Sequence, residues 1–244
     1  MSKTAVITGA ASGIGRACAQ ALTADGFDVV SWDLASEEPV DVTNSASVAD
    51  AVARLDGPLD AVVLAAGVSR MAPLLETTDD DWHFQMNVNA FGVFNCLRAL
   101  APALRPGSAI AVIDSMAGLR GAPHLSAYSA SKFAVTGLIE AVTPELAVHD
   151  VRINGICPMY VRTPMETREL AWEGKLRGMT PEQVFAEYER TTPLGRVAEP
   201  EEIASTALFL VTDPSRYMTG SFLTVSGGAH LGFTVDRNQK ERES

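Results

Sequence analysis

A tyrosine and a lysine four residues apart are the residues best suited to moving a proton. Tyr128 and Lys132 lie in Ser126–Lys132, a segment predicted to open a helix, so both side chains share one face. Because a free tyrosine titrates at about 10, a neighbouring ammonium would favour its phenolate and lower its pKa. Ser115 ends an apolar run and would hydrogen-bond a substrate oxygen as charge develops on it. By themselves, Tyr128 and Lys132 would fit an exposed helix pair equally well.

Glycines after the first apolar run have the spacing of a phosphate-binding turn. Residues 4–8 read TAVIT, and residues 9–15 read GAASGIG before a helical pattern begins. Glycines let a pyrophosphate approach the backbone N–H groups and the helix N-terminus. The alternative is an ordinary strand-to-helix turn that uses glycine for positive φ. The residues expected to bind a dinucleotide here are Gly9, Ser12, Gly13, Ile14 and Gly15.

The second apolar run ends in a carboxylate that favours NAD over NADP. Asp33 follows the glycines by about 20 residues, the spacing at which an acidic side chain accepts hydrogen bonds from the adenosine ribose. It would repel a 2′-phosphate, and Leu34 and the two residues after it supply no basic side chain. A solvated strand-end aspartate is the alternative. Asp41 and Val42 are candidates for contact with the adenine.

Alternating strands and helices must position these groups. Short β-branched or apolar runs between helical stretches are typical of buried parallel strands joined by right-handed crossovers. The sequence therefore predicts an α/β fold, a single doubly wound, Rossmann-like parallel sheet with helices on both faces. The runs lie at 4–8, 28–33, 61–67, 109–115, 151–158 and 221–227, and the helices at 13–25, 45–54, 79–104, 127–149 and 200–212.

Composition excludes several other classes of protein. The 244 residues are 47% hydrophobic and 20% charged, which suits one globular domain, taken here as 1–235 with a polar tail at 236–244. A net charge of −11 without a basic run argues against nucleic acid as a partner. The apolar runs are too short to cross a membrane, and Met1–Lys3 leaves no space for a signal peptide.

Cysteine and histidine positions bear on location and on metal binding. Cys18, Cys96 and Cys157 are far apart in apolar stretches, which predicts buried free thiols and a cytoplasmic protein. The four histidines lack metal-ligand spacing, so no metal site is expected. His124 lies in the loop between Ser115 and Tyr128, where it would either touch substrate or be solvated.

Taken together and in order, the motifs resemble the short-chain dehydrogenase/reductase superfamily over essentially the whole chain. They are TGAASGIG, AAG at 65–67, Asn89 in MNVNAFGVF, Ser115, YSASK, NGICP and PLGRVAEPEEIA. The resemblance implies that Tyr128 is the acid/base, that Lys132 and Ser115 support it, and that Asn89 holds a helix and a proton-relay water. It also implies a homo-oligomer, a tetramer or dimer. It adds Ala65, Ala66, Gly67, Pro158, Val161 and Thr163 to the cofactor contacts.

Three departures from the family pattern concern the shape of the pocket. Leu64–Gly67 stands where the family usually has Asn-Asn-Ala-Gly, and Ser226–Gly228 stands where it has Asp-Gly-Gly. Met159 replaces the glycine that usually follows NGICP, which places a larger side chain beside the expected nicotinamide pocket. None of these changes removes a catalytic group.

We expect hydride transfer between NAD(H) and a secondary alcohol or ketone, a small-molecule substrate. The PLGRVAEPEEIA motif also resembles 3-oxoacyl thioester reductases, which usually take NADPH, whereas the Asp33–Asp41 link and AAGVSRM resemble dehydrogenases of cyclic dihydrodiols. A non-catalytic protein that senses dinucleotides could share the fold. The combination of Tyr128, Lys132, Ser115 and Asn89 argues against it, since a sensor needs no acid/base.

Residues 164–193 interrupt the alternation and are predicted to form a mobile substrate lid. The segment leaves the strand that ends at Pro158, on the ligand-binding edge of the sheet. Its pattern predicts two short amphipathic helices with Gly174 and Gly178 as hinges. Met159, Met165 and Trp172 would contact substrate, which favours a hydrophobic or cyclic body. The alternative is that the apolar side chains only pack the lid onto the domain.

Overall fold

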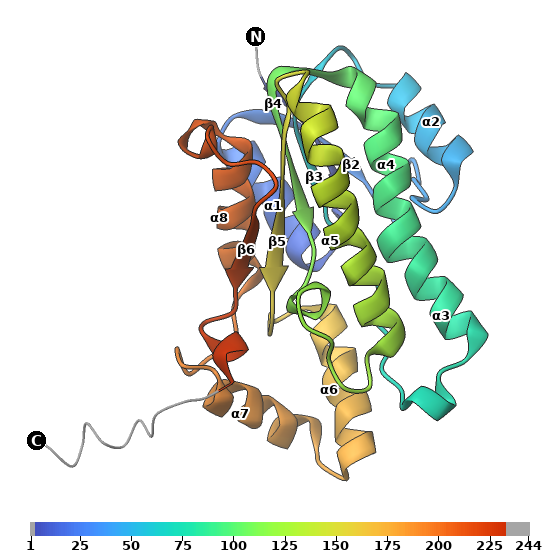
Figure 1. Cartoon of the computed structure of the whole chain (residues 1–244), viewed down its shortest axis with the longest axis vertical. Helices are drawn as coiled ribbons and strands as arrows, with labels where there is room; N and C mark the ends of the chain where they lie inside the picture. The colour runs from blue at the N-terminus through green and yellow to red at the C-terminus, as the bar shows by residue number, and fades with distance from the viewer. Residues whose placement is uncertain (1–2, 233–244) are drawn as a thin grey trace, which may run out of the picture.

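Six parallel strands form one sheet in the order β2-β1-β3-β4-β5-β6 in the computed structural model, which describes residues 3–232 (Figure 1). Five of the six runs expected from the sequence differ from the observed strands by only a few residues, whereas β4 begins at residue 104 instead of 109. The strands are β1 (Lys3–Thr8), β2 (Phe27–Trp32), β3 (Leu59–Leu64), β4 (Leu104–Ile113), β5 (Arg152–Pro158) and β6 (Phe222–Val225).

Helices cover both faces of the sheet, which confirms the predicted doubly wound α/β fold. Helices α1 (Gly13–Ala24) and α8 (Pro200–Val211) pack against each other on one face. The other face carries α2 (Ser45–Ala53), α4 (Gly92–Leu100) and α5 (Ser126–Ala147) (Figure 1). Each face has its own hydrophobic core. Burial on both faces explains why the central strands read as continuous apolar runs.

The helix expected over 79–104 is interrupted, so that expectation was wrong in detail. Helix α3 (Asp79–Gln85) and α4 are joined by a π-helical segment, Met86–Phe91. A π turn widens the helix and is uncommon outside such single turns. Asn89 lies in this turn, and its side chain bonds to two neighbouring segments, contacts that stabilise the widened form.

Two helices lie below the carboxyl ends of the strands, where the lid segment was expected (Figure 1). They are α6 (Pro164–Arg177) and α7 (Pro181–Thr191). Gly178 ends α6 in the left-handed region, with φ of 65°. Gly174 lies inside α6, where a Cβ would come 2.7 Å from the Met179 carbonyl oxygen, so close packing explains this glycine better than a hinge. The tail at 236–244 is outside the described residues.

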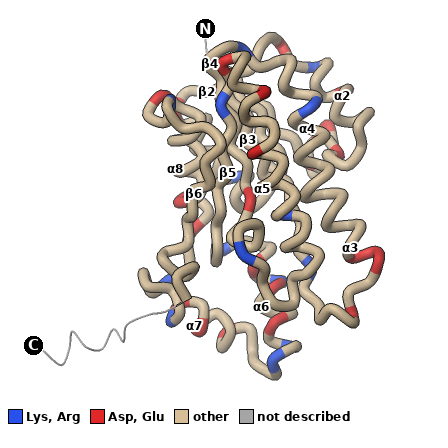
Figure 2. Tube along the Cα trace, viewed as in Figure 1, with Lys and Arg blue, Asp and Glu red and all other residues tan. Residues whose placement is uncertain are grey.

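The charged residues and the three cysteines are distributed as the sequence analysis expects. Lys and Arg are interspersed with Asp and Glu along the described chain, instead of gathering on one element (Figure 2). Cys18, Cys96 and Cys157 are buried and free, as expected, and burial raises the pKa of each thiol to about 12. Between residues 3 and 232, no helix is long and apolar enough to cross a membrane.

Candidate active site

A cavity of about 1050 Å³ extends along the carboxyl ends of the strands and under the two lid helices. It begins at the glycine turn, passes the end of β2 and reaches α5 and the segment after β5. Of the residues predicted to form the site, Asn89 and Trp172 do not line it. Those that do are Gly9, Ser12, Gly13, Ile14, Gly15, Asp33, Leu34, Asp41, Val42, Ala65, Ala66, Gly67, Ser115, Tyr128, Lys132, Pro158, Met159, Val161, Thr163 and Met165.

The glycine turn is a cradle that side chains would fill. Gly9 has φ of 68°, and a Cβ there would lie 2.8 Å from the Ala66 backbone nitrogen. A Cβ at Gly15 would lie 2.1 Å from the Gly9 carbonyl oxygen, so no other residue fits. Helix α1 starts inside the turn, and its Ser12 N-cap makes no side-chain capping bond. The exposed helix N-terminus and small residues fit a pyrophosphate.

Asp33 is held at the rim of this cradle. One carboxylate oxygen accepts a hydrogen bond from the Ala11 N–H at 3.1 Å, and the other accepts one from the Ala35 N–H at 2.9 Å. Each oxygen keeps further acceptor capacity for ribose hydroxyls. Asp41 differs, because its Oδ1 already accepts from the backbone N–H and the hydroxyl of Thr43. Asp41 and Val42 both line the cavity, and their contact with an adenine stays a prediction.

Ser115, Tyr128 and Lys132 meet in the same cavity. Ser115 caps a short helical turn after β4, and its Oγ accepts the Ala117 N–H at 3.0 Å. Its own proton is therefore available, and hydrogen bonding from Ser115 lowers the pKa of Tyr128. The buried Lys132 ammonium donates to the Ile113 carbonyl oxygen at 2.9 Å. Neighbouring elements thus hold a hydroxyl, a phenol and an ammonium in one place.

The protein groups alone do not make Tyr128 easier to ionise. Burial raises the pKa of Tyr128 above its usual value, and the charges of Glu169 and Asp114 raise it further. The lowering of this pKa expected from Lys132 together with an oxidised nicotinamide concerns the enzyme with its cofactor bound, and it stays a prediction. Burial also lowers the pKa of Lys132, while Asp114 and Cys157 raise it.

Asp114 is a charged member of this site that the sequence analysis missed. It is only 3% exposed, and its Oδ2 accepts a hydrogen bond from the Thr136 hydroxyl at 2.8 Å. Its Oδ1 has no hydrogen-bond partner among the described residues. Burial raises the pKa of Asp114, and the positive charge of Lys132 lowers it. A carboxylate at the end of an apolar strand, next to Ser115, was the available signal.

Asn89 is fully buried behind the cavity and acts through structure. Its Oδ1 accepts the Val68 N–H at 2.8 Å, and its Nδ2 donates to the Val68 carbonyl and the Ser131 hydroxyl, both at 2.9 Å. These bonds join the segment after β3 to α5, the helix that carries Tyr128. The side chain thus positions the acid/base helix; the implied proton-relay water remains a prediction.

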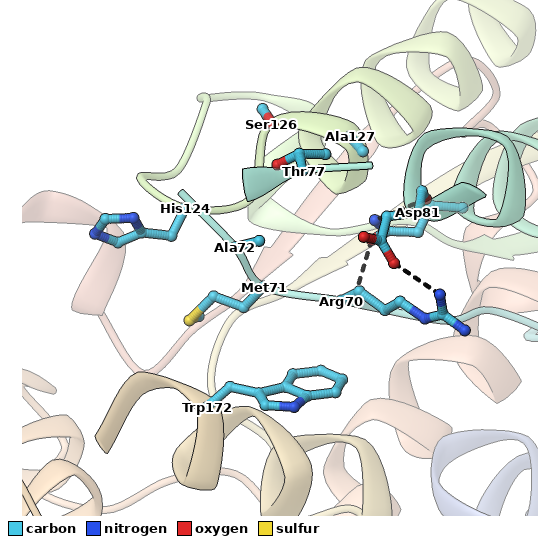
Figure 3. Close-up of a pocket in the computed structure, with 10 residues that line it drawn as sticks. Arg70, Met71, Ala72, Thr77, Asp81, His124, Ser126, Ala127 and Trp172 are labelled. Carbon is cyan, nitrogen blue, oxygen red and sulfur yellow. Dashed lines mark hydrogen bonds and ion pairs between the residues drawn. The ribbon is translucent and has the colours of Figure 1, made fainter. Parts of the chain in front are cut away.

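Trp172 belongs to a smaller pocket of about 240 Å³ (Figure 3). Its indole extends from α6 toward the segment that carries Arg70 and Met71, and Arg70 pairs with Asp81 at 2.7 Å. Met71 and His124 line both pockets, so the smaller one adjoins the main cavity. Trp172 is therefore placed to contact only a distal part of a substrate.

Most apolar residues of the lid pack on one another. Leu170, Val184, Tyr188 and Val197 form a separate small core, against which Met179 and others pack. The Tyr188 ring also stacks on that of Tyr160, with centroids 3.8 Å apart. Met165 is the lid methionine that lines the cavity. The packing alternative holds for most of these side chains.

The lid also contributes acidic residues that the sequence analysis did not single out. Glu166 and Glu169 on α6 line the cavity, as do Glu173 and Glu187. Glu173 and Glu187 both pair with Arg177, whereas no ion pair is formed by Glu166 or Glu169 among the described residues. The described residues contain no group of three or more His, Cys, Asp or Glu able to hold a metal ion.

Comparisons with known proteins cover nearly the whole chain. Residues 9–230 match a family model described as enoyl-(acyl carrier protein) reductase. Oxidoreductase UcpA of Escherichia coli is 34% identical over 96% of both chains. L-2,3-butanediol dehydrogenase of Corynebacterium glutamicum is 36% identical over 93% of this chain and 98% of its own. The 3-oxoacyl-[acyl-carrier-protein] reductase of Thermotoga maritima is 32% identical over 93% of this chain and 97% of its own.

Solved structures agree in fold. Aldohexose dehydrogenase of Thermoplasma acidophilum, in ligand-free form, superimposes with a TM-score of 0.87 at 27% identity and covers 94% of each chain. An actinorhodin polyketide ketoreductase with NADPH gives a TM-score of 0.88 at 28% identity, with 94% of this chain and 97% of that chain covered.

Proposed function

The chain belongs to the short-chain dehydrogenase/reductase superfamily, whose members use a nicotinamide dinucleotide, and we propose that it is an NAD-dependent dehydrogenase of a secondary alcohol. The observation that carries the proposal is the continuity of one cavity from the glycine turn and Asp33 to Ser115, Tyr128 and Lys132. A dinucleotide held at one end would bring its reactive ring to the acid/base group at the other.

In the proposed oxidation, the substrate hydroxyl lies between Ser115 and Tyr128. The Tyr128 phenolate takes the hydroxyl proton as the carbonyl forms, and Ser115 donates a hydrogen bond to the oxygen. When bound, the oxidised nicotinamide supplies the hydride acceptor and a positive charge. In reduction, Tyr128 returns the proton to the new alkoxide. Lys132 provides a fixed positive charge, with its orientation set by the Ile113 carbonyl.

NAD is proposed over NADP because of the Asp33 carboxylate. Its two oxygens are fixed by backbone N–H groups and face the cavity, where they would accept ribose hydrogen bonds and repel a 2′-phosphate. The neighbouring Leu34 is 68% exposed and offers no charge to a phosphate. The pyrophosphate would lie on the glycine turn, and Val161 and Thr163 would flank the nicotinamide.

The substrate is proposed to have an apolar or cyclic body. Met159 and Met165 line the cavity beside the segment after β5, where their side chains suit hydrocarbon. The relative from Corynebacterium glutamicum is a dehydrogenase of L-2,3-butanediol, which supports a secondary alcohol as the substrate. We further propose that 164–193 is a lid whose closure selects the substrate, and that the three buried free thiols reflect a cytoplasmic location.

A second candidate is reduction of a 3-oxoacyl thioester. It is favoured by the 32% identity to the Thermotoga maritima reductase and by the description of the matching family model. It is disfavoured by Asp33, whose carboxylate would repel the 2′-phosphate of NADPH.

The proposed function is tested by measuring NADH absorbance when purified protein is mixed with NAD and a panel of secondary alcohols. We expect turnover with NAD and little with NADP. Turnover confined to NADPH and an acetoacetyl thioester would favour the second candidate instead. An absence of turnover with every alcohol, ketone and thioester would contradict both.

A further inference from the structure

The part of the cavity wall that α6 forms contains a buried carboxyl oxygen without a hydrogen-bond partner among the described residues. Glu166 is 6% exposed, lines the cavity, and its Oε1 makes no hydrogen bond with any described residue. Such a group costs free energy unless a ligand or water satisfies it. Its backbone N–H is bound to the Thr163 hydroxyl at 3.2 Å, which fixes the first turn of α6 above the site.

Glu169 lies one turn further along α6, on the same face. It also lines the cavity, and its charge is near enough to the reacting phenol to raise the pKa of Tyr128. Burial raises the pKa of Glu169, whereas Ser69, in the segment after β3, and the positive charge of Arg168 lower it. The lid helix therefore carries a carboxyl group to the reacting end of the cavity.

These groups define the chemistry of whatever lies against them. A carboxylate accepts hydrogen bonds, so these groups would bind a hydroxyl of the substrate. Burial and the neighbouring charge of Glu169 raise the pKa of Glu166 to about 7, so near neutral pH this carboxyl group can donate a hydrogen bond when protonated and accept one when ionised. A hydroxyl group, which both donates and accepts, matches it in either state.

We infer that Glu166 and Glu169 bind a second hydroxyl of the substrate, so that the preferred substrate is a neutral diol or hydroxyketone. One substrate oxygen lies at Ser115 and Tyr128, and the other lies against the carboxyl groups of α6. This inference rests on the proposed function and narrows its substrate class. The apolar side chains of Met159 and Met165 contact the carbon body between them.

The test compares each diol with the matching mono-alcohol. We expect wild-type kcat/KM with NAD to be at least about tenfold higher for trans-1,2-cyclohexanediol than for cyclohexanol, since a hydrogen bond to a charged group contributes that much. The same order is expected for 2,3-butanediol and 2-butanol. In Glu169→Gln and Glu166→Gln, the advantage of the diol falls severalfold, while the mono-alcohols change little. Glu182→Gln, an exposed lid residue outside the cavity, keeps the wild-type ratio.

Three results would overturn the inference. They are a wild-type ratio near one, a ratio unchanged in both cavity variants, and a higher kcat/KM for 1-amino-2-propanol than for 1,2-propanediol. Circular dichroism and NADH affinity identify any variant that fails to fold, in which case Glu169→Asp replaces it.

A failure of the proposed function is recognised separately. If no alcohol is oxidised, the affinity of the enzyme–NADH complex for each diol and mono-alcohol is measured by NADH fluorescence. Tighter binding of the diols that depends on Glu169 supports the inference without turnover. Equal or absent binding overturns it.

Discussion

The ammonium nitrogen of Lys132 lies 5.8 Å from the centre of the Tyr128 ring, one turn along α5. The buried ammonium is held by the Ile113 carbonyl, so its charge is fixed relative to the phenol. From this geometry we predict that Lys132 stabilises a Tyr128 phenolate and contacts the ribose of a bound cofactor.

Replacing Lys132 by Ala should therefore impair both catalysis and cofactor binding. We expect kcat/KM to fall by about 100-fold or more, the usual effect of removing a buried electrostatic group from an active site. NADH affinity, measured by fluorescence titration, should fall as well. Lys175→Ala, on the exposed side of α6, should change neither quantity. Wild-type NADH affinity in Lys132→Ala would exclude its contact with the cofactor.

Asp33 should decide between the two cofactors. The wild type is expected to prefer NAD over NADP by at least roughly tenfold in kcat/KM, or 1.4 kcal/mol. Asp33→Ala removes both the ribose hydrogen bonds and the repulsion of a 2′-phosphate, and should narrow that gap. Asp28→Ala, exposed on β2, the strand that Asp33 follows, is the matched control and should preserve the preference for NAD. Equal kcat/KM for NAD and NADP in the wild type would defeat this assignment.

Asp114 should set the pH range of the reaction. Its charge raises the pKa of Tyr128 and that of Lys132. Oxidation needs ionised Tyr128 and charged Lys132. The value of kcat/KM therefore rises with pH as Tyr128 ionises and falls as Lys132 loses its proton. Asp114→Asn lowers both values, and the whole kcat/KM profile should move to lower pH. Ser115, Glu169 and Cys157 also act on Tyr128 and are unchanged.

The measurement is the pH dependence of kcat/KM for wild type, Asp114→Asn and the exposed control Asp50→Asn. Asparagine keeps an acceptor for the Thr136 hydroxyl, so the fold should be retained. A profile that stays in place, or moves to higher pH, would contradict the role given to Asp114.

Exposed aromatic side chains on neighbouring helices predict a symmetric homo-oligomer. Phe91 ends the π-helical turn, Phe94 lies in the first turn of α4, and Phe133 lies on α5. All three side chains are 38–47% exposed. A monomer would leave this apolar surface in water. We expect light scattering to give a multiple of 25.9 kDa, and Phe94→Glu with Phe133→Glu to reduce it. Tyr217 is fully exposed and is not part of this aromatic surface, so Tyr217→Glu should leave the measured mass unchanged. A wild-type monomer at micromolar concentration would refute the prediction.

Local spacing was enough to predict the sheet and much of the site. Tyr128 and Lys132 share a helix face because they are four residues apart, and Ser115 joins them because parallel strands end at one edge of the sheet. The spacing of the glycines after the first strand predicts Gly9 and Gly15 in the turn, and in the structure a Cβ at either position would clash with backbone atoms. Each of these inferences depends on neighbours in sequence or on the general rule for α/β sheets.

Features set by distant packing could not be predicted in the same way. Glu166 and Glu169 look like solvated residues of a helix N-terminus, and only the placement of α6 turns them into the cavity. The placement of α6 also puts Trp172 in the adjoining pocket instead of the main cavity. The π turn at Met86–Phe91 depends on bonds from Asn89 to Val68 and Ser131, residues 21 and 42 positions away.

The measurement that most directly tests hydride transfer through a tyrosine acid/base is the steady-state rate of Tyr128→Phe with NAD and a secondary alcohol. The change removes the transferable proton and little cofactor contact, so we predict a loss of 10²-fold or more in kcat, the range of about 10²–10⁴ expected for general acid/base catalysis. NADH affinity should stay within a few-fold of wild type. A Tyr128→Phe protein that keeps more than about a tenth of the wild-type rate would contradict this account.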